Sequence, residues 1–540
     1  MESLAIHNVE LLILLLVLFV AGLAALAKRF HTPYPIVLVI GGLLISFFPR
    51  APRVELSPDI VFLVILPPLL FAAAFHTSWH DFRYNLVSIS MLAFGLVAFT
   101  VVGVAAAARW ILPGFDWRTG LVLGAVVSTT DAIAATAIAT RVGLPKRIVD
   151  ILEGESLVND ASGLVALEFA VALVVSERTP SIVEGAGRLL YLIATSIVIG
   201  LIVGKLAHII LARIEDAAIE ITLILIAPFV AYLSAEGVRS SGILAVIACG
   251  LYLGHKSSLY FSRAARLRSG SFWDTLTFIL NGLVFILIGL QLPYVLEAIR
   301  ELSFARLLVD GLIFSAFLIA LRLIWIYPGA FVANLIRRRL QHQEEALPNP
   351  RSIFLVGWTG MRGVVALAAA ISLPQFLADG QPFPKRDVMI FLTFCVIFVT
   401  LVLQGLTLPA LIRRLGLAGE RGKNPEELRA RRAITEAALA YLENARDSDT
   451  QNLAPIYDDL IRHHRSRLSF LEVEGGDSDD TAFRRDEYDR LREISAHVRS
   501  VERAALLHLR NQHQISDEIL RTLEREIDLT EARLASSEYL

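Results

Sequence analysis

The chain contains a succession of apolar stretches, each about 20 residues long, and this feature limits its fold more than any other. Hydrophobic residues make up 55% of its 540 positions, more apolar surface than a water-soluble chain of this size could bury. In lipid, each backbone polar group must be bonded inside the protein, so long apolar stretches form helices. A β-barrel would instead show short strands of alternating polarity. The sequence therefore predicts an all-α, polytopic membrane protein.

Short polar connections divide the apolar stretches into about thirteen predicted spans. They lie near 9–27, 34–49, 59–76, 86–108, 119–140, 147–175, 189–212, 217–236, 241–254, 272–296, 307–336, 352–374 and 388–413. The stretch at 241–254 is short for a complete span.

Basic residues in the connections predict the orientation. With thirteen spans, the loops that carry Lys146 and Arg147, Arg263 and Arg266, and residues 337–339 all fall on one side. Basic loops stay in the cytoplasm, so the N-terminus is expected outside and the C-terminal tail inside. The formal net charge of −2 gives no indication of a nucleic-acid partner.

The composition changes abruptly after the last apolar stretch. We therefore expect a transmembrane domain over residues 1–413 and a helical, cytosolic tail over 414–540. Helical patterns run near 425–446, 453–472 and 481–537, the first after an Asn424-Pro425 helix start. The pattern is compatible with three forms of the tail: a helical hairpin, a helix that pairs with a second copy, and a solvated charged tail without a specific role.

Two acidic clusters occur in successive apolar spans, within residues 129–163. Asp131 lies among hydroxyl residues in the first span, and Asp160 lies deep in the second. A carboxylate at membrane depth costs at least a few kcal/mol, so it is a functional-site candidate by default. Hydroxyl groups beside Asp131 can bond the backbone and loosen that helix, which would free carbonyl oxygens for an ion. Interhelical hydrogen bonding is the simpler alternative.

In the second span, Glu155, Ser156, Asn159 and Asp160 are close together on a helix. Ser156 and Asp160 are four residues apart, as are Glu155 and Asn159, so the members of each pair share a face. Carboxylate, amide and hydroxyl oxygens suit a hard cation such as Na⁺, so Asp160, Asn159 and Ser156 are candidate ligands, with Asp131 and Thr130 opposite. The two cysteines, Cys249 and Cys395, lie in apolar stretches without metal-ligand spacing, and no cofactor is expected.

A later apolar span is interrupted by Gly357-Trp-Thr-Gly-Met-Arg-Gly363. Gly360, Arg362 and Gly363 weaken a helix there. One interruption in each half of the chain is typical of inverted-repeat transporters. The alternative is a packing motif whose glycines allow close contact.

Arg322 lies inside another apolar span and needs an acidic partner, for which Glu155 is our candidate. The alternative is that it reaches an interface. Glu168 could extend a polar path or bond another helix. Asn281, Gln291, Gln404 and Glu236 are interpreted as contacts between helices.

Three motifs carry a resemblance to a known family: Thr130-Asp131-Ala132, Glu155-Ser-Leu-Val-Asn-Asp160 and Gly360-Met-Arg-Gly363. With Leu66-Pro-Pro-Leu-Leu-Phe71, they resemble the NhaP and sodium/proton exchanger branch of the cation/proton antiporters, most closely its bacterial members. The resemblance covers roughly residues 9–413.

The resemblance implies two inverted repeats, two discontinuous helices that cross where they unwind, and a homodimer. By position it makes Asp160 the ion- and proton-binding carboxylate, with Asp131, the Thr130 carbonyl and Ser156 facing the ion. Asn159 would mark an electroneutral type, and Glu155 would pair with Arg322.

Two positions depart from the family's pattern. Ala72 follows Phe71 where many members carry an acid, and Ala132 follows Asp131 where proline is frequent. The first bears on ion selectivity, and the second leaves the unwinding of the helix to the hydroxyl residues.

These observations lead to the hypothesis of a secondary antiporter, not an enzyme, that exchanges Na⁺ for H⁺ across the plasma membrane. The chain has no Walker motif, so ATP drive is not expected. K⁺/H⁺ exchange is the alternative within this class. An ion channel, or a membrane scaffold with a signalling tail, represents a different class.

Overall fold

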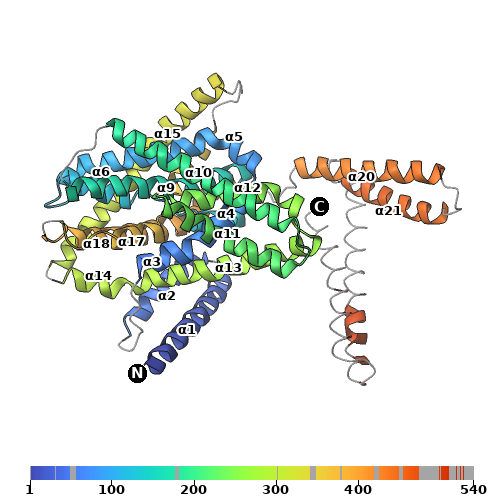
Figure 1. The fold of residues 1–540 in the computed structure, drawn as a ribbon, viewed down its shortest axis with the longest axis horizontal. Coiled ribbons are helices and arrows are strands. Elements are labelled where there is room, and N and C mark those ends of the chain that lie inside the picture. Colours follow the sequence, from blue (N-terminus) through green and yellow to red (C-terminus); the bar gives the residue numbers. More distant parts are fainter. Residues whose placement is uncertain are drawn as a thin grey trace. The chain divides into compact units, whose positions relative to one another are not determined.

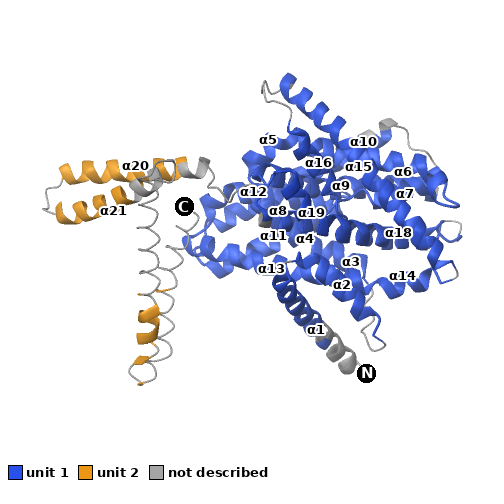
Figure 2. Cartoon of the chain, turned by 180° about the vertical axis from the view of Figure 1, so that it is seen from behind, with its two compact units in different colours: residues 1–419 blue, residues 420–540 orange. Residues whose placement is uncertain are grey.

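The computed structural model describes residues 2–30, 32–48, 56–176, 182–300, 302–340, 348–377, 380–418, 425–448 and 454–473, with scattered positions between 498 and 527. The chain divides into two compact units, Met1–Gly419 and Glu420–Leu540 (Figure 2). This division lies close to the change in composition at residue 413. The predicted helix start at Asn424, and most of the predicted helix at 481–537, lie outside the described residues.

The first unit is a bundle of helices (Figure 1). Within the described ranges, nine helical stretches are long and apolar enough to cross a membrane, which makes this a multi-pass membrane protein. These stretches are α3–η1–α4 (Pro58–His76), α5–η2–α6 (Trp79–Ile111), α9 (Lys146–Ser176), α10 (Ile182–Leu211), α11 (Ala217–Gly237), α12 (Gly242–Tyr260), α13–α14 (Arg263–Ala298), α15 (Phe304–Leu340) and α18–η3–α19 (Arg386–Arg414).

The remaining helices of this unit are α1, α2 and two pairs of short helices. Their bounds are α1 (Glu2–Arg29), α2 (Tyr34–Ser46), α7 (Trp117–Val126) with α8 (Ile133–Val142), and α16 (Pro350–Trp358) with α17 (Val364–Ile371). Each pair replaces one continuous apolar stretch of the sequence, at 119–140 and at 352–374. The short stretch predicted at 241–254 continues to Tyr260 and gives the 19-residue helix α12.

Small residues allow α2 and α13 to pack closely. A Cβ added at Gly42 would run into the carbonyl of Ile286, and one added at Gly289 would run into the carbonyl of Val39. Small residues at helix contacts are typical of membrane bundles, where dispersion and close packing replace the hydrophobic effect. This contact fixes the position of α13 against α2.

The described part of the second unit contains a helical hairpin. It consists of α20 (Pro425–Asp447) and α21 (Ala454–Val473), near the bounds predicted from helical spacing. Arg446 pairs with Asp458 at 3.1 Å, and Arg465 pairs with Glu443 at 2.7 Å across the hairpin. These pairs are solvent-exposed, so each contributes at most about 1 kcal/mol.

Candidate ion-binding site

The two interrupted helices contact each other directly at their breaks. The backbone N–H of Asp131, between α7 and α8, donates to the carbonyl of Met361, between α16 and α17, at 2.8 Å. Arg362 Nε donates to the Val127 carbonyl at 3.1 Å. The unwound segments therefore satisfy part of each other's backbone hydrogen bonding, as irregular backbone inside a membrane requires.

Hydroxyl side chains replace helical bonds at both breaks. Ser128 Oγ donates to the Ala125 carbonyl at 2.8 Å, and Thr359 Oγ1 donates to the Val356 carbonyl at 3.0 Å. Such local bonds offer the backbone an alternative to the helix. The N–H of Ala132 donates to Ser156 Oγ at 3.2 Å, a bond that a proline at this position could not make. The first helix thus unwinds at Ala132 without a proline.

Arg362 belongs to the break between α16 and α17, and its side chain reaches the C-terminal end of α7. The residue is 2% exposed. Besides Val127, its guanidinium donates to the Gly360 carbonyl, and its backbone N–H donates to Thr400 Oγ1 at 3.2 Å. A cation at a helix C-terminus is favourable because unpaired carbonyls carry partial negative charge there. Arg362 therefore stabilises the break.

The two glycines beside Arg362 allow close approach. A Cβ at Gly360 would run into the side chain of Arg322, and a Cβ at Gly363 would run into the carboxylate of Asp131. The Asp131 carboxylate consequently lies against the start of α17, and its Oδ1 also accepts from the Ile133 N–H, at the start of α8, at 2.8 Å. Helix N-termini favour negative charge, so the starts of both half-helices provide a favourable position for the Asp131 carboxylate.

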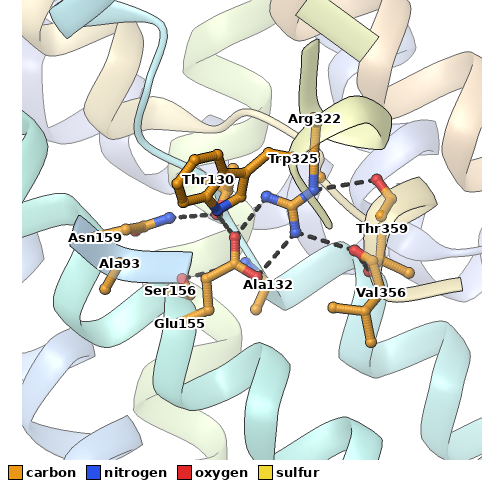
Figure 3. A network of polar contacts seen from close by, with 12 residues as sticks. Ala93, Thr130, Ala132, Glu155, Ser156, Asn159, Arg322, Trp325, Val356 and Thr359 are labelled. Atoms are coloured by element: carbon orange, nitrogen blue, oxygen red, sulfur yellow. Dashed lines mark hydrogen bonds and ion pairs between the residues drawn. The ribbon is translucent and has the colours of Figure 1, made fainter. Parts of the chain in front are cut away.

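Glu155 and Arg322 form a buried, two-pronged ion pair (Figure 3). Arg322 Nη1 contacts Glu155 Oε1 at 2.5 Å, and Nη2 contacts Oε2 at 2.8 Å. The guanidinium also donates to the carbonyls of Gly357 and Val356 at 3.1 and 3.0 Å, at the end of α16. This pair ties α9 and α15 to the second broken helix.

Asn159 belongs to the same network rather than to the cavity. Its Nδ2 donates to Thr130 Oγ1, and Thr130 Oγ1 donates to Glu155 Oε1 at 3.1 Å (Figure 3). Ser156 and Asp160 line the cavity, whereas Glu155 and Asn159 do not appear in its described lining. Asn159 is therefore absent from the described lining of the cavity, in contrast to its place in the predicted ligand set.

Asp160 and Ser156 point to a cavity of about 300 Å³ that Asp131 and Thr130 also line. Four acidic side chains line it, and none of its described lining residues is Lys or Arg. These acids are Asp131, Glu153, Asp160 and Asp274. A cleft lined by one sign of charge, with apolar walls, concentrates ions of the opposite sign. The cavity is thus suited to cations and protons.

The two central carboxylates differ in their surroundings. Asp131 accepts the Ile133 N–H bond described above, whereas Asp160 is 6% exposed and, within the described ranges, its carboxylate accepts no hydrogen bond and forms no ion pair. An unpaired buried carboxylate is costly unless a proton or a cation neutralises it. Asp160 is the group whose charge a transported ion could balance.

Several lining residues were given no role by sequence reasoning: His76, Glu153, Asp274 and Thr277. For Glu153 a signal existed, because Glu153, Ser156 and Asp160 follow helical spacing on one face. Asn281 was interpreted as a contact between helices. Glu168 contacts Arg188 of α10 at 3.3 Å and is exposed, so it bonds another helix and does not line the cavity.

Within the described residues, no group of three or more His, Cys, Asp and Glu side chains could hold a metal ion. The side chains that line the cavity offer carboxylate, hydroxyl and amide oxygens, which suit a hard cation. Cys249 and Cys395 are buried and free.

Comparisons with known proteins agree with this geometry. A family model described as the transmembrane sodium/hydrogen exchanger matches residues 15–414. The chain is 33% identical over 533 residues to an uncharacterized Na⁺/H⁺ exchanger of Mycobacterium bovis, covering 96% of both chains. It is 34% identical over 415 residues to a sodium, potassium, lithium and rubidium/H⁺ antiporter of Bacillus subtilis, covering 74% of this chain and 61% of that one.

A solved structure shares the fold. The sodium proton antiporter MjNhaP1 from Methanocaldococcus jannaschii, at pH 8, matches 78% of this chain and 100% of its own with a TM-score of 0.59 and 19% identity. Together with the family match over most of the chain, this confirms the resemblance drawn from the motifs. The chain belongs to the transmembrane sodium/hydrogen exchanger family, and the expected Na⁺/H⁺ antiport is confirmed as the activity of that family.

Proposed function

We propose that the protein exchanges one Na⁺ for one H⁺ by letting the two ions compete for Asp160. The observation that carries this proposal is the buried, unpaired Asp160 carboxylate in a cavity lined by acids and by no described Lys or Arg. The neighbouring buried arginines are engaged elsewhere, Arg322 with Glu155 and Arg362 with backbone carbonyls.

Competition at one carboxylate produces coupled exchange. A proton on Asp160 removes the charge that Na⁺ needs, and bound Na⁺ removes the charge that would attract the proton. The empty, ionised site is costly to bury, so the protein changes its exposure only when one of the two ions is bound. One positive charge moves each way, which makes the exchange electroneutral.

The proposed Na⁺ ligands are Asp160, Asp131, Ser156 and Thr130, all of which line the cavity. Asn159 would act through Thr130, to which its amide donates, and not as a direct ligand. Ser156 Oγ also accepts a hydrogen bond from the Ala132 N–H, so this proposed ligand is tied to the unwound backbone between α7 and α8.

The finer architecture is part of the same proposal. α1, α2 and the pairs α7/α8 and α16/α17 add four spans to the nine long ones and give thirteen, with the C-terminal unit in the cytoplasm. The similar breaks in the two halves support two inverted repeats, one moving against the other around the site. The assembly is proposed to be a homodimer in the plasma membrane, as the family resemblance implies.

Substitution of Asp160 by Asn tests the function directly. Purified Asp160→Asn protein in liposomes should show no Na⁺-driven proton flux, while it folds and melts like the wild type. Glu168→Gln is the matched control, since Glu168 is a carboxylate of the same helix outside the cavity. Wild-type exchange by Asp160→Asn would overturn the proposal.

K⁺/H⁺ or mixed monovalent cation/H⁺ exchange is a second candidate. It is favoured by the Bacillus subtilis relative, whose name includes potassium, lithium and rubidium. Dose curves for Na⁺, K⁺, Li⁺ and Rb⁺ on the same liposomes distinguish these activities.

A channel and a scaffold with a signalling tail make different predictions. A channel would carry current, whereas one-for-one exchange is insensitive to an imposed membrane potential. A scaffold would lose its cellular effect when the tail after residue 419 is removed, although ion exchange would persist.

A further inference from the structure

Helix α13 lines the cavity with a row of polar side chains whose spacing equals that of the row on α9. On α13 the row is Asp274, Thr277 and Asn281, and on α9 it is Glu153, Ser156 and Asp160. Both rows have separations of three and then four residues, so each follows one face of its helix. All six side chains line the same cavity.

The two rows also become buried in the same order. On α13, Asp274 is exposed, Thr277 is half-buried and Asn281 is buried. On α9, Glu153 and Ser156 are half-buried and Asp160 is buried. An acidic residue therefore lies at the outer end of each row, and the inner ends are Asp160 on α9 and Asn281 on α13.

Asn281 is the buried polar group of the α13 row, at 8% exposure. Its Oδ1 accepts no hydrogen bond from any residue that the structure describes. Its amide lies beside the Tyr34 hydroxyl of α2. A buried amide oxygen without a hydrogen-bond partner carries the full free-energy penalty of its desolvation unless a donor or a cation approaches it.

We propose that Asn281 contributes a neutral oxygen ligand to the transported cation and thereby sets cation affinity against proton affinity. This inference rests on the proposed exchange at Asp160. A bare cation needs several oxygens to replace its water, whereas a proton needs only the carboxylate. An amide oxygen therefore stabilises the cation-bound state and leaves the protonated state nearly unchanged.

Ala72 is consistent with a neutral ligand elsewhere in the cavity lining. It lines the cavity from α4, at the position where the family resemblance places an acid. Ala72 supplies only a methyl group to the lining, whereas Asn281 supplies a buried polar side chain from α13. A neutral amide also preserves a single exchangeable charge, in keeping with one-for-one exchange.

The competing interpretation is that Asn281 merely joins α13 to α2 through Tyr34. Truncation to Asn281→Ala separates the two roles. For a ligand, the apparent KM for Na⁺ should rise about three- to tenfold, with the maximal rate and the pH dependence at saturating Na⁺ retained. For a purely structural contact, thermal stability would fall and the KM for Na⁺ would not change.

Asn281→Asp provides an isosteric second variant. A carboxylate at this point should lower the apparent KM for Na⁺ and make exchange respond to an imposed membrane potential, because a second charge joins the site. Thr275→Ala is the control, since Thr275 is an exposed residue of the same helix that bonds its own backbone.

The experiment is Na⁺-driven proton flux in liposomes for wild type, the two Asn281 variants, Thr275→Ala and Asp160→Asn. An unchanged KM for Na⁺ in both Asn281 variants, with no transport by Asp160→Asn, overturns the role of Asn281 alone. Transport by Asp160→Asn overturns the proposed function itself. Altered KM values in opposite directions for Asn281→Ala and Asn281→Asp support the inference.

Discussion

Arg322 and Glu155 form a two-pronged ion pair with each residue 1% exposed, although 167 positions separate them in the chain. The pair also bonds two carbonyls at the end of α16 and the hydroxyl of Thr130. It therefore connects both broken helices to α9 and α15 without occupying the cation cavity. We propose that this pair holds the framework of the site.

Removal of one member of this pair should be strongly destabilising. Glu155→Ala or Arg322→Ala leaves an unpaired buried charge, which costs about 3–5 kcal/mol. The double variant should lose less stability than the two single losses added together, because no charge remains unpaired. Thermal melting of the detergent-solubilised protein measures the stability of the three variants. A loss in the double variant equal to the sum of the two single losses would contradict the prediction.

A methyl group at Gly363 should disable transport. Its Cβ would run into the Asp131 carboxylate, so either Asp131 or the start of α17 must move. We expect Gly363→Ala to reduce exchange at least tenfold, on the order of 1.4 kcal/mol or more in the transport step. Gly270→Ala is the matched control, since a Cβ there meets nothing within 4 Å, and it should transport normally.

Lysine at position 362 should not replace arginine. Lysine keeps the charge but lacks the planar fork that reaches both the Val127 and Gly360 carbonyls. A carbonyl left unbonded inside the protein costs about 1–3 kcal/mol. Melting temperatures should therefore fall for Arg362→Lys and stay unchanged for Arg268→Lys, an exposed position on α13. Equal stability of the two variants would argue against the capping role.

The apparent affinity for Na⁺ should fall as the solution becomes more acidic. Protons and Na⁺ compete for Asp160, so at pH values where the site is mostly protonated the apparent KM rises about tenfold for each unit of pH lost. At saturating Na⁺ the maximal rate should change much less. Flux measured over a grid of pH and Na⁺ concentration tests this, and a KM that is independent of pH would exclude competition at one site.

Local patterns in the sequence determined the membrane class, the breaks and the identity of the buried acids. Long apolar stretches have few alternatives to helices in lipid, and hydroxyl and glycine residues at 128–130 and 357–363 mark where those helices weaken. Helical spacing also put Ser156 with Asp160, and Glu155 with Asn159, on a shared face, because side-chain direction on a helix follows from residue number alone.

The tertiary structure alone decided which surfaces meet. Asn159 carries an amide oxygen that could serve as a cation ligand. Its side chain nevertheless bonds Thr130 and lies outside the described cavity lining. Asn281 looked like an ordinary contact between helices, and its place in the cavity lining that it shares with Asp160 depends on the close packing of α2 and α13 at Gly42 and Gly289. Contacts between residues so far apart in the chain depend on how whole helices pack, and no local pattern of residues encodes that arrangement.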